Sequence, residues 1–256
     1  MGDVRAGGPW LPSEMQYHIN VLEMKAIHYA LRSFLQEVQG CHVRILSDNT
    51  TAVSVINNMG TVRSKDCNRV AQEIWHFCKS HQIWVTCAHI PGIDNSDSDF
   101  ESRKIYKQAE WMLTRSLYIR ALKFFDFSPT IDCFASRTNC QHPVYASLRP
   151  DPYAAYVDAF SLNWQDFNCY IFPPFSVIGK VLQKIRIDNV VALCVLPHWP
   201  TQAWWPLMQQ MMEKGPLVLP PRQTNLVLPN SPEELHPLHQ KLKLLVCLLS
   251  GNIMRQ

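Results

Sequence analysis

The sequence predicts an α/β protein with two domains, a class indicated by its alternating elements and by a change of composition along the chain. Short apolar strands alternate with helical segments, as in residues 41–58, where an alternating strand runs through a polar turn into a helix. The 256 residues, of which 47% are hydrophobic, can bury one large core or two modest ones. Near residue 125 the chain becomes rich in proline and aromatic residues, which indicates that a second domain begins there.

The bulk composition indicates an intracellular protein, either cytoplasmic or nuclear. Nine cysteines form an odd set without a CxxC pair, which indicates a reducing compartment and not a disulfide framework. Cys133, Cys140 and His142 lack a fourth metal ligand at suitable spacing, so we expect cysteines packed in the core. No run reaches the roughly eighteen apolar residues of a membrane span, so we expect no membrane partner. The net charge of +3 permits a polyanionic partner without requiring one.

The first predicted helix carries the first candidate site residue. Residues 1–13 are rich in glycine and proline and predict a loop. The Asn20-x-x-Glu23 spacing is close to a capping box, and apolar residues then recur at helical spacing, which predicts a helix from about Val21 to Glu37. Glu23 falls in the first turn of this helix. A carboxylate there either caps the helix or faces a metal ion, and both interpretations stay open.

The second candidate residue, Asp48, follows a predicted strand. The segment Cys41–Ser47 alternates with the two-residue period of a strand, and a helix follows it until a left-handed stop at Asn58–Gly60. In an open α/β sheet, chemistry is placed just beyond the carboxyl ends of strands, which is the position of Asp48. The alternative is that Asp48 or Asn49 only caps the helix.

Two further candidates come from the next strand and helix. A helix is predicted from about Lys65 to Ser80 and a strand over Ile83–His89, followed by a polar loop and a helix that opens at Asp99. His89 and Asp99 are candidates for chemistry because they stand ten residues apart around this loop. Helix capping by Asp99 is the alternative.

Three stretches of this half resemble the ribonuclease H domain of retroelement reverse transcriptases, and most closely the DIRS-type (tyrosine-recombinase) elements, over about residues 7–103. They are HINVLEMKAIHYAL, ILSDNTTAVSVINNMG and HIPGIDNSDSDFESR. The resemblance implies a mixed sheet with flanking helices and hydrolysis of the RNA strand of RNA/DNA hybrids by two Mg²⁺ (or Mn²⁺) ions. It places Glu23, Asp48 and Asp99 on metal-binding acids, and His89 on a loop histidine that assists product release or proton movement.

The sequence departs from this family at its amino end. The first acid of the family lies on a strand upstream of Met1, and Asp3, in a Gly-rich segment, is a poor substitute for it. We therefore expect truncated amino-terminal strands, an exposed sheet edge, and weak or no nuclease activity from this chain alone. The absent strand could come from an upstream reverse transcriptase segment, which is a candidate partner together with the RNA/DNA hybrid or another nucleic acid.

Residues 104–124 are predicted to form a basic helical connector. Six lysines and arginines lie among apolar residues between Glu101 and Lys123. Contact with phosphates is a secondary role that this segment could have.

The second domain, expected over residues 125–212, is predicted to be a Rossmann-like α/β unit. A strand end enters a turn at Thr130–Ser136, and a further strand is predicted over Cys169–Phe172. A helix from about Ser176 to Ile187 then leads to a continuous apolar run over Val190–Leu196, typical of a strand that is buried on both faces. This order predicts parallel strands joined by a helical crossover.

This domain resembles the phage Dam-type DNA adenine methyltransferases in the stretches IDCFASRTN, FSLNW, IFPPFSVIGKVLQKI and LCVLPHWPTQAWW. The resemblance implies that Asp132 lies near an S-adenosylmethionine site and that Pro173, Pro174 and Phe175 form the loop that binds a flipped base. In active relatives this loop starts with Asp or Asn, whereas here it starts with Phe172, which cannot accept a hydrogen bond. We therefore expect a degenerate domain with a vestigial pocket that neither binds S-adenosylmethionine nor transfers methyl groups.

The remaining residues, 213–256, are predicted to be a Pro-rich segment and a terminal helix. Prolines between Gly215 and Pro237 argue against regular structure, and Leu238–Leu249 is predicted to be an amphipathic helix that packs on the body of the protein. The tryptophans near Pro200 are assigned to packing, with base stacking as the alternative.

Three functions are compatible with these observations. The first is a ribonuclease H-type endonuclease within a retroelement polyprotein. The second is a non-catalytic module that binds nucleic acid or protein. The third, and least favoured, is DNA adenine methylation.

Overall fold

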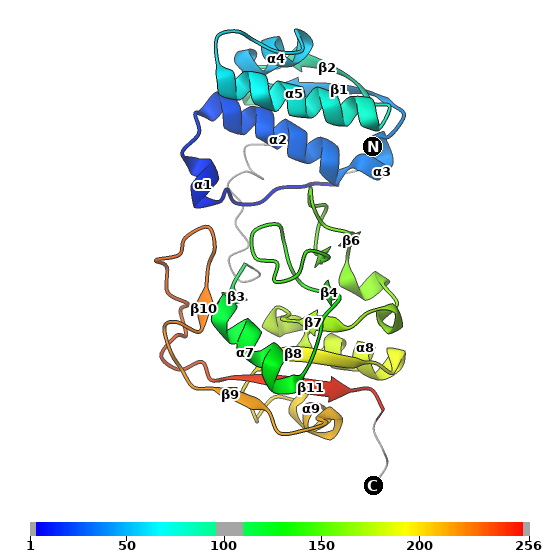
Figure 1. Cartoon of the computed structure of the whole chain (residues 1–256), viewed down its shortest axis with the longest axis vertical. Helices are drawn as coiled ribbons and strands as arrows, with labels where there is room; N and C mark the ends of the chain where they lie inside the picture. Colours follow the sequence, from blue (N-terminus) through cyan, green and yellow to red (C-terminus); the bar gives the residue numbers. More distant parts are fainter. Residues whose placement is uncertain (1–3, 96–109, 253–256) are drawn as a thin grey trace. The chain divides into compact units, whose positions relative to one another are not determined.

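The computed structural model describes residues 4–95 and 110–252, and these form two compact units with an α/β fold (Figure 1). The first unit contains the described residues up to 95 together with Pro150–Tyr153. The second contains residues 110–149 and 154–252. The predicted α/β class is confirmed.

The first unit begins with a short helix, α1 (Pro12–Met15), and a long one, α2 (Ile19–Ser33). The α2 helix starts earlier than predicted because the Nδ1 atom of His18 accepts a hydrogen bond from the backbone N–H of Asn20, 3.2 Å away, and so caps the helix. It also ends earlier, at Ser33, and a separate turn, α3 (Leu35–Val38), follows. The predicted capping box at Asn20 is therefore wrong.

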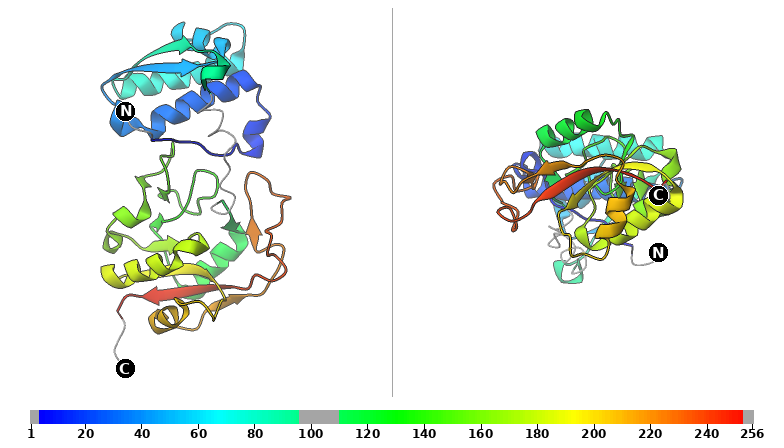
Figure 2. Two further views of the ribbon diagram at one scale, coloured as in Figure 1. Left: turned by 180° about the vertical axis from the view of Figure 1, so that it is seen from behind. Right: turned by 90° about the horizontal axis from the view of Figure 1, so that it is seen from below.

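Two parallel strands form the sheet of the first unit within the described residues. Strand β1 (His42–Ser47) pairs with β2 (Trp84–His89), with Ser47 opposite His89. The connection between them contains two helices, α4 (Thr50–Asn57) and α5 (Lys65–Ser80). Figures 1 and 2 show α2 and α5 side by side across one face of this strand pair. The strand and helix predictions for residues 41–89 are confirmed.

Two features of the helical connection follow from single residues. The predicted left-handed stop after α4 is found at Met59 and Gly60, which have φ angles of 58° and 151°. A Cβ atom on Gly60 would lie 2.6 Å from Oδ1 of Asn68, so only glycine fits there without a shift. The α5 helix buries the predicted apolar stripe, which includes Ile74 and Cys78, in the core of this unit.

The second unit contains a five-stranded sheet in the order β4-β7-β8-β11-β9. Its parallel strands are β4 (Ile131–Asp132), β7 (Cys169–Ile171) and β8 (Val191–Pro197). Helix α8 (Ile178–Asp188) joins β7 to β8, as predicted. Strand β11 (Leu244–Ser250) is antiparallel to β8 and to the last strand, β9, which covers residues 217–219.

The predicted terminal helix over Leu238–Leu249 is wrong, because most of this segment belongs to strand β11. Its sequence is apolar at nearly every position, and such a run fits a strand buried on both faces as well as a buried helix. The segment forms a strand because its backbone pairs with β8 on one edge and with β9 on the other. The Pro-rich segment also contains regular structure, namely β9 and β10 (Leu226–Val227). The sheet of the second unit therefore extends beyond residue 212, to Ser250.

The predicted basic connector also belongs to the second unit where it is described. Strand β3 (Met112–Leu113) pairs with β10, and helix α7 (Arg115–Phe125) follows it. This helix buries Tyr118, Ala121 and Phe125 in the core on its side of the sheet, so it stabilises the unit and is no mere connector. The part of the predicted connector between residues 104 and 109 lies outside the described residues.

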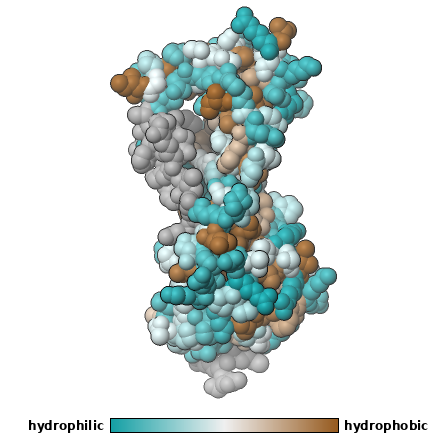
Figure 3. Space-filling model, turned by 90° about the vertical axis from the view of Figure 1, so that its left-hand side faces the viewer, coloured by the Kyte–Doolittle hydropathy of each residue, from teal (hydrophilic) through white to brown (hydrophobic). Residues whose placement is uncertain are grey.

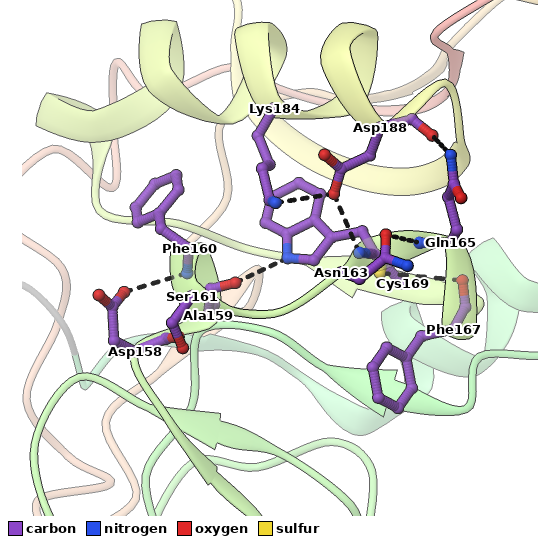
Figure 4. Close-up of polar contacts among 11 residues, drawn as sticks. Asp158, Ala159, Phe160, Ser161, Asn163, Gln165, Phe167, Cys169, Lys184 and Asp188 are labelled. Carbon is purple, nitrogen blue, oxygen red and sulfur yellow. Dashed lines mark hydrogen bonds and ion pairs between the residues drawn. The ribbon is translucent and has the colours of Figure 1, made fainter.

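The chain ahead of β7 is fixed to α8 by a buried polar network (Figure 4). The carboxylate of Asp188 accepts hydrogen bonds from the backbone N–H of Trp164 at 3.0 Å and from Nζ of Lys184 at 2.8 Å. The Gln165 side chain donates to the backbone carbonyl of Asp188, and the Trp164 indole donates to Ala159. Because each buried polar group has a partner, this segment can be packed without a loss of hydrogen bonds.

The remaining elements of the second unit are short. They are β5 (Ala146–Ser147), β6 (Tyr156–Val157), α9 (Trp205–Met211) and single 3-10 turns at Ala159–Ser161, Trp164–Asp166 and Phe175–Val177. The surface in Figure 3 is mostly hydrophilic, with apolar residues in small groups. Among the described residues, none of the helices has the length and apolar character needed to cross a bilayer.

Candidate functional site

The carboxyl ends of β1 and β2 meet at one edge of the first unit. Ser47 and His89 are register partners, and the backbone N–H of Ile90 donates to the carbonyl of Ser47 over 3.0 Å. Asp48, which directly follows Ser47, and His89, which ends β2, therefore lie at the same edge, and both are exposed. The structure thus brings two of the predicted site residues together.

Asp48 is not the cap of the helix that follows it. The N-cap of α4 is Asn49, whose Oδ1 accepts from the backbone N–H of Ala52 at 2.9 Å. The hydroxyl of Ser47 accepts from the backbone N–H of Asn49 at 3.1 Å and so fixes the turn. Within the part of the chain that the structure describes, no hydrogen bond or ion pair engages the Asp48 carboxylate, which leaves it available to a ligand.

Glu23 lies in the second turn of α2, because the helix begins at Ile19. His18 caps α2, so Glu23 is not needed to cap this helix. Burial raises the pKa of Glu23 above its ordinary value, and the negative charge of Asp48 raises it further. The two carboxylates are therefore close enough to repel each other. A pair of acids with this property is stabilised by a bound cation.

The loop after β2 brings a third segment to the same place. A Cβ atom added to Gly92 would lie 3.5 Å from Oδ2 of Asp48, so the loop backbone passes directly beside this carboxylate. Gly92 begins a 3-10 turn, Gly92–Asn95. A side chain at position 92 would therefore touch the Asp48 carboxylate.

The fourth predicted site residue, Asp99, lies outside the described residues. Across residues 4–95 and 110–252, no group of three or more histidine, cysteine, aspartate or glutamate side chains is arranged to hold a metal ion. The described part of the site therefore consists of two carboxylates, Glu23 and Asp48, with His89 at the same edge.

In the second unit, the predicted cofactor residue Asp132 ends strand β4 and is only 2% exposed. Its Oδ2 accepts from the backbone N–H of Gln141 at 2.9 Å, and its Oδ1 lies 3.5 Å from the backbone N–H of Phe134. Burial raises the pKa of Asp132 to about 7, and these two backbone donors lower it in part. The carboxyl group is thus engaged inside the unit and turned away from solvent.

The predicted base-binding loop follows the neighbouring strand β7. Pro173 is buried, whereas Pro174 and Phe175 are half-buried. The Phe175 ring packs edge-on against Trp199, with ring centroids 5.0 Å apart, and Phe172 packs against the same core. Aromatic side chains of the chain itself therefore occupy the carboxyl ends of these strands.

Some structural roles at these sites were not evident from the sequence. The Asn49 side chain donates from Nδ2 to Oδ1 of Asn20 over 2.9 Å, which joins two helix starts that are 29 residues apart. No local pattern predicts such a contact, because both residues also fit ordinary caps. The buried thiol of Cys133 interacts with Cys169 on the adjacent strand, in agreement with a packing role for the cysteines.

Comparison with models of known protein families gives no match for this chain, and comparison with curated proteins gives none either. Its function is therefore inferred from its residues and their arrangement.

Proposed function

We propose that the first unit is a ribonuclease H-type metal site that acts on the RNA strand of RNA/DNA hybrids and that derives from a retroelement polyprotein. The observation that carries the proposal is that Glu23 on α2 lies near Asp48 at the carboxyl end of β1, so that the charge of Asp48 raises the pKa of Glu23. The sequence resemblance adds Asp99 as a third acid. The proposed cations are Mg²⁺ or Mn²⁺, because carboxylate oxygens suit hard divalent ions.

Each residue of the site has a proposed task. Glu23 and Asp48 would hold the metal ions, which when bound would activate the attacking water and stabilise the leaving 3′ oxygen. The exposed ring of His89 at the same edge could carry a proton or assist the release of the cleaved strand.

The second unit is proposed to be a Rossmann-like domain that has lost methyl transfer. Three parallel strands with a helical crossover between β7 and β8 support this relationship. The burial of Asp132 and the packing of Phe175 on Trp199 favour a scaffold over an S-adenosylmethionine site. Incubation with S-adenosylmethionine carrying a labelled methyl group would test this proposal, since methyl transfer to DNA would contradict it.

The alternative function for the whole chain is a non-catalytic module that binds nucleic acid or protein. It is favoured by the finding that only two carboxylates meet within the described part of the metal site. In that case an upstream reverse transcriptase segment is a proposed partner. Along β1 the described residues provide pairing on one edge only, by β2, and the other edge could take a further strand.

The deciding experiment is cleavage of a labelled RNA/DNA hybrid by the full chain with Mg²⁺ or Mn²⁺. The proposal predicts weak metal-dependent cleavage, because the first acid of the family is missing, and Glu23→Gln should remove it. The matched control is Asp66→Asn, which changes an exposed acid in the first turn of α5. Binding of the hybrid without cleavage would support the non-catalytic alternative. Cleavage that survives Glu23→Gln would contradict the proposed site.

A further inference from the structure

The amide of Asn49 connects the two helices that carry the proposed site. Its Oδ1 accepts from the backbone N–H of Ala52 at 2.9 Å, and its Nδ2 donates to Oδ1 of Asn20 at 2.9 Å. The first contact requires an oxygen and the second a nitrogen, so the orientation of the amide is determined by its partners. One planar group therefore joins the start of α4 to the start of α2.

This connection lies next to both carboxylates. Asn20 precedes Glu23 by three residues on α2, so the two side chains lie on the same face of that helix. Asp48 is the residue before Asn49, and its turn is fixed from the other side by the hydroxyl of Ser47. A displacement of α2 relative to α4 would therefore change the separation between Glu23 and Asp48.

We propose that Asn49 is a positioning residue, which through Asn20 holds Glu23 and Asp48 at the separation needed to bind divalent cations. The inference rests on the proposed metal site. Two carboxylates without a cation repel each other, so a tie between their helices pre-organises the site. Serine, threonine and aspartate also cap helices, but aspartate has no donor, and the hydroxyl of serine or threonine is the same short group that would cap α4, so none of them replaces the amide nitrogen that reaches Asn20.

The test compares variants of the full chain that separate capping from the connection. Asn49→Ser keeps an oxygen for the cap, adds no charge and removes the amide nitrogen that donates to Asn20. Asn20→Ala leaves Asn49 intact and removes the acceptor. Asn58→Ala is the control, because its amide bonds the Ser54 carbonyl within α4 and reaches no other helix.

Calorimetric titration with Mn²⁺ measures the expected effect. We expect both connection variants to bind Mn²⁺ about 10-fold more weakly, as for other residues that orient metal ligands. The double variant should lose no more than either single variant, because both remove the same contact. The control should stay within about 2-fold of the wild-type affinity.

A second measurement reports on the contact itself without metal. The side-chain amide protons of Asn49, followed by NMR, should exchange with solvent more slowly in the wild-type protein than in Asn20→Ala. Equal exchange rates would show that the contact does not hold in solution and would overturn the inference.

The failure of the inference can be distinguished from failure of the proposed function. If the wild-type protein binds Mn²⁺ and Asn49→Ser binds it equally well, the positioning role is wrong and the metal site stands. If the wild-type protein binds no Mn²⁺, the proposed function is contradicted, and the positioning role with it.

Discussion

Both units place an aspartate at the carboxyl end of a parallel strand, yet the two side chains have opposite environments. Asp48 follows β1, is exposed and has no hydrogen bond to another described residue. Asp132 ends β4, is 2% exposed and is bonded to the backbone of Gln141. The comparison shows that a strand end offers a position for chemistry, while the surrounding loops decide whether a carboxylate can reach a ligand.

The loops that follow the neighbouring strands differ in the same way. In the first unit, the loop after β2 passes beside Asp48 at Gly92, which has no side chain. In the second, the loop after β7 inserts Phe175, which packs against Trp199. Aromatic packing thus stabilises the second unit at the carboxyl end of β7.

The largest expected effect is on hybrid cleavage. Asp48→Asn should reduce Mg²⁺-dependent cleavage by about a thousandfold, because it removes a metal ligand. Asp132→Asn should leave the rate unchanged, since its carboxyl group is engaged inside the second unit. The measurement is the initial rate of cleavage. An equal loss of rate in Asp48→Asn and Asp132→Asn would contradict the proposed difference between the two aspartates.

The next effect concerns folding of the second unit. A Cβ atom at Gly251 would lie 2.3 Å from the carbonyl oxygen of Ile185 and 2.7 Å from the Cα of Asn189, and both are backbone atoms that cannot move freely. Gly251→Ala should therefore destabilise this unit by about 3 kcal/mol. Urea unfolding followed by tryptophan fluorescence measures this. If the units fold independently, cleavage by the first unit should survive the substitution.

The pH dependence of stability sharpens the comparison further. The pKa of Asp132 is raised from 3.8 to about 7 in the folded protein, so the folded state keeps a proton that the unfolded state loses. The free energy of unfolding should fall as pH rises from about 4 to about 7 and level off above, with a total change of at most about 4 kcal/mol. Asp132→Asn should flatten this dependence in urea titrations. A dependence that persists unchanged would place its origin in another group.

The smallest expected effect is a stabilisation of the folded protein, whereas most substitutions destabilise it. Glu23 has a raised pKa, partly because of Asp48, so the two charges together destabilise the folded state once pH exceeds the ordinary pKa of Glu23. Asp48→Asn should therefore stabilise the first unit by a few tenths of a kcal/mol at neutral pH. Thermal unfolding by circular dichroism measures the shift. No stabilisation, or a loss, would show that the two carboxylates do not repel each other in solution.

Elements with a clear period were predictable from the sequence. The alternation of residues 41–47 and the helical stripe of α5 depend on neighbours along the chain, and both match the structure. The strand over Leu244–Ser250 was not predictable from the sequence. A run that is apolar at nearly every position shows neither the two-residue period of a strand nor the 3.6-residue period of a helix. Its strand pairing comes from β8 and β9, which are distant in sequence.

For the candidate site too, some features were predictable from the sequence and others were set by the tertiary structure. The sequence alone determined that Asp48 follows a strand and that Glu23 lies near the start of a helix, because both depend on local periodicity. Only the tertiary structure decided that Asn49 and His18 provide the caps, that Glu23 and Asp48 approach each other, and that Asp132 is buried. The physical reason is that solvent access and charge repulsion are set by side chains far apart in the chain, and packing alone brings these together.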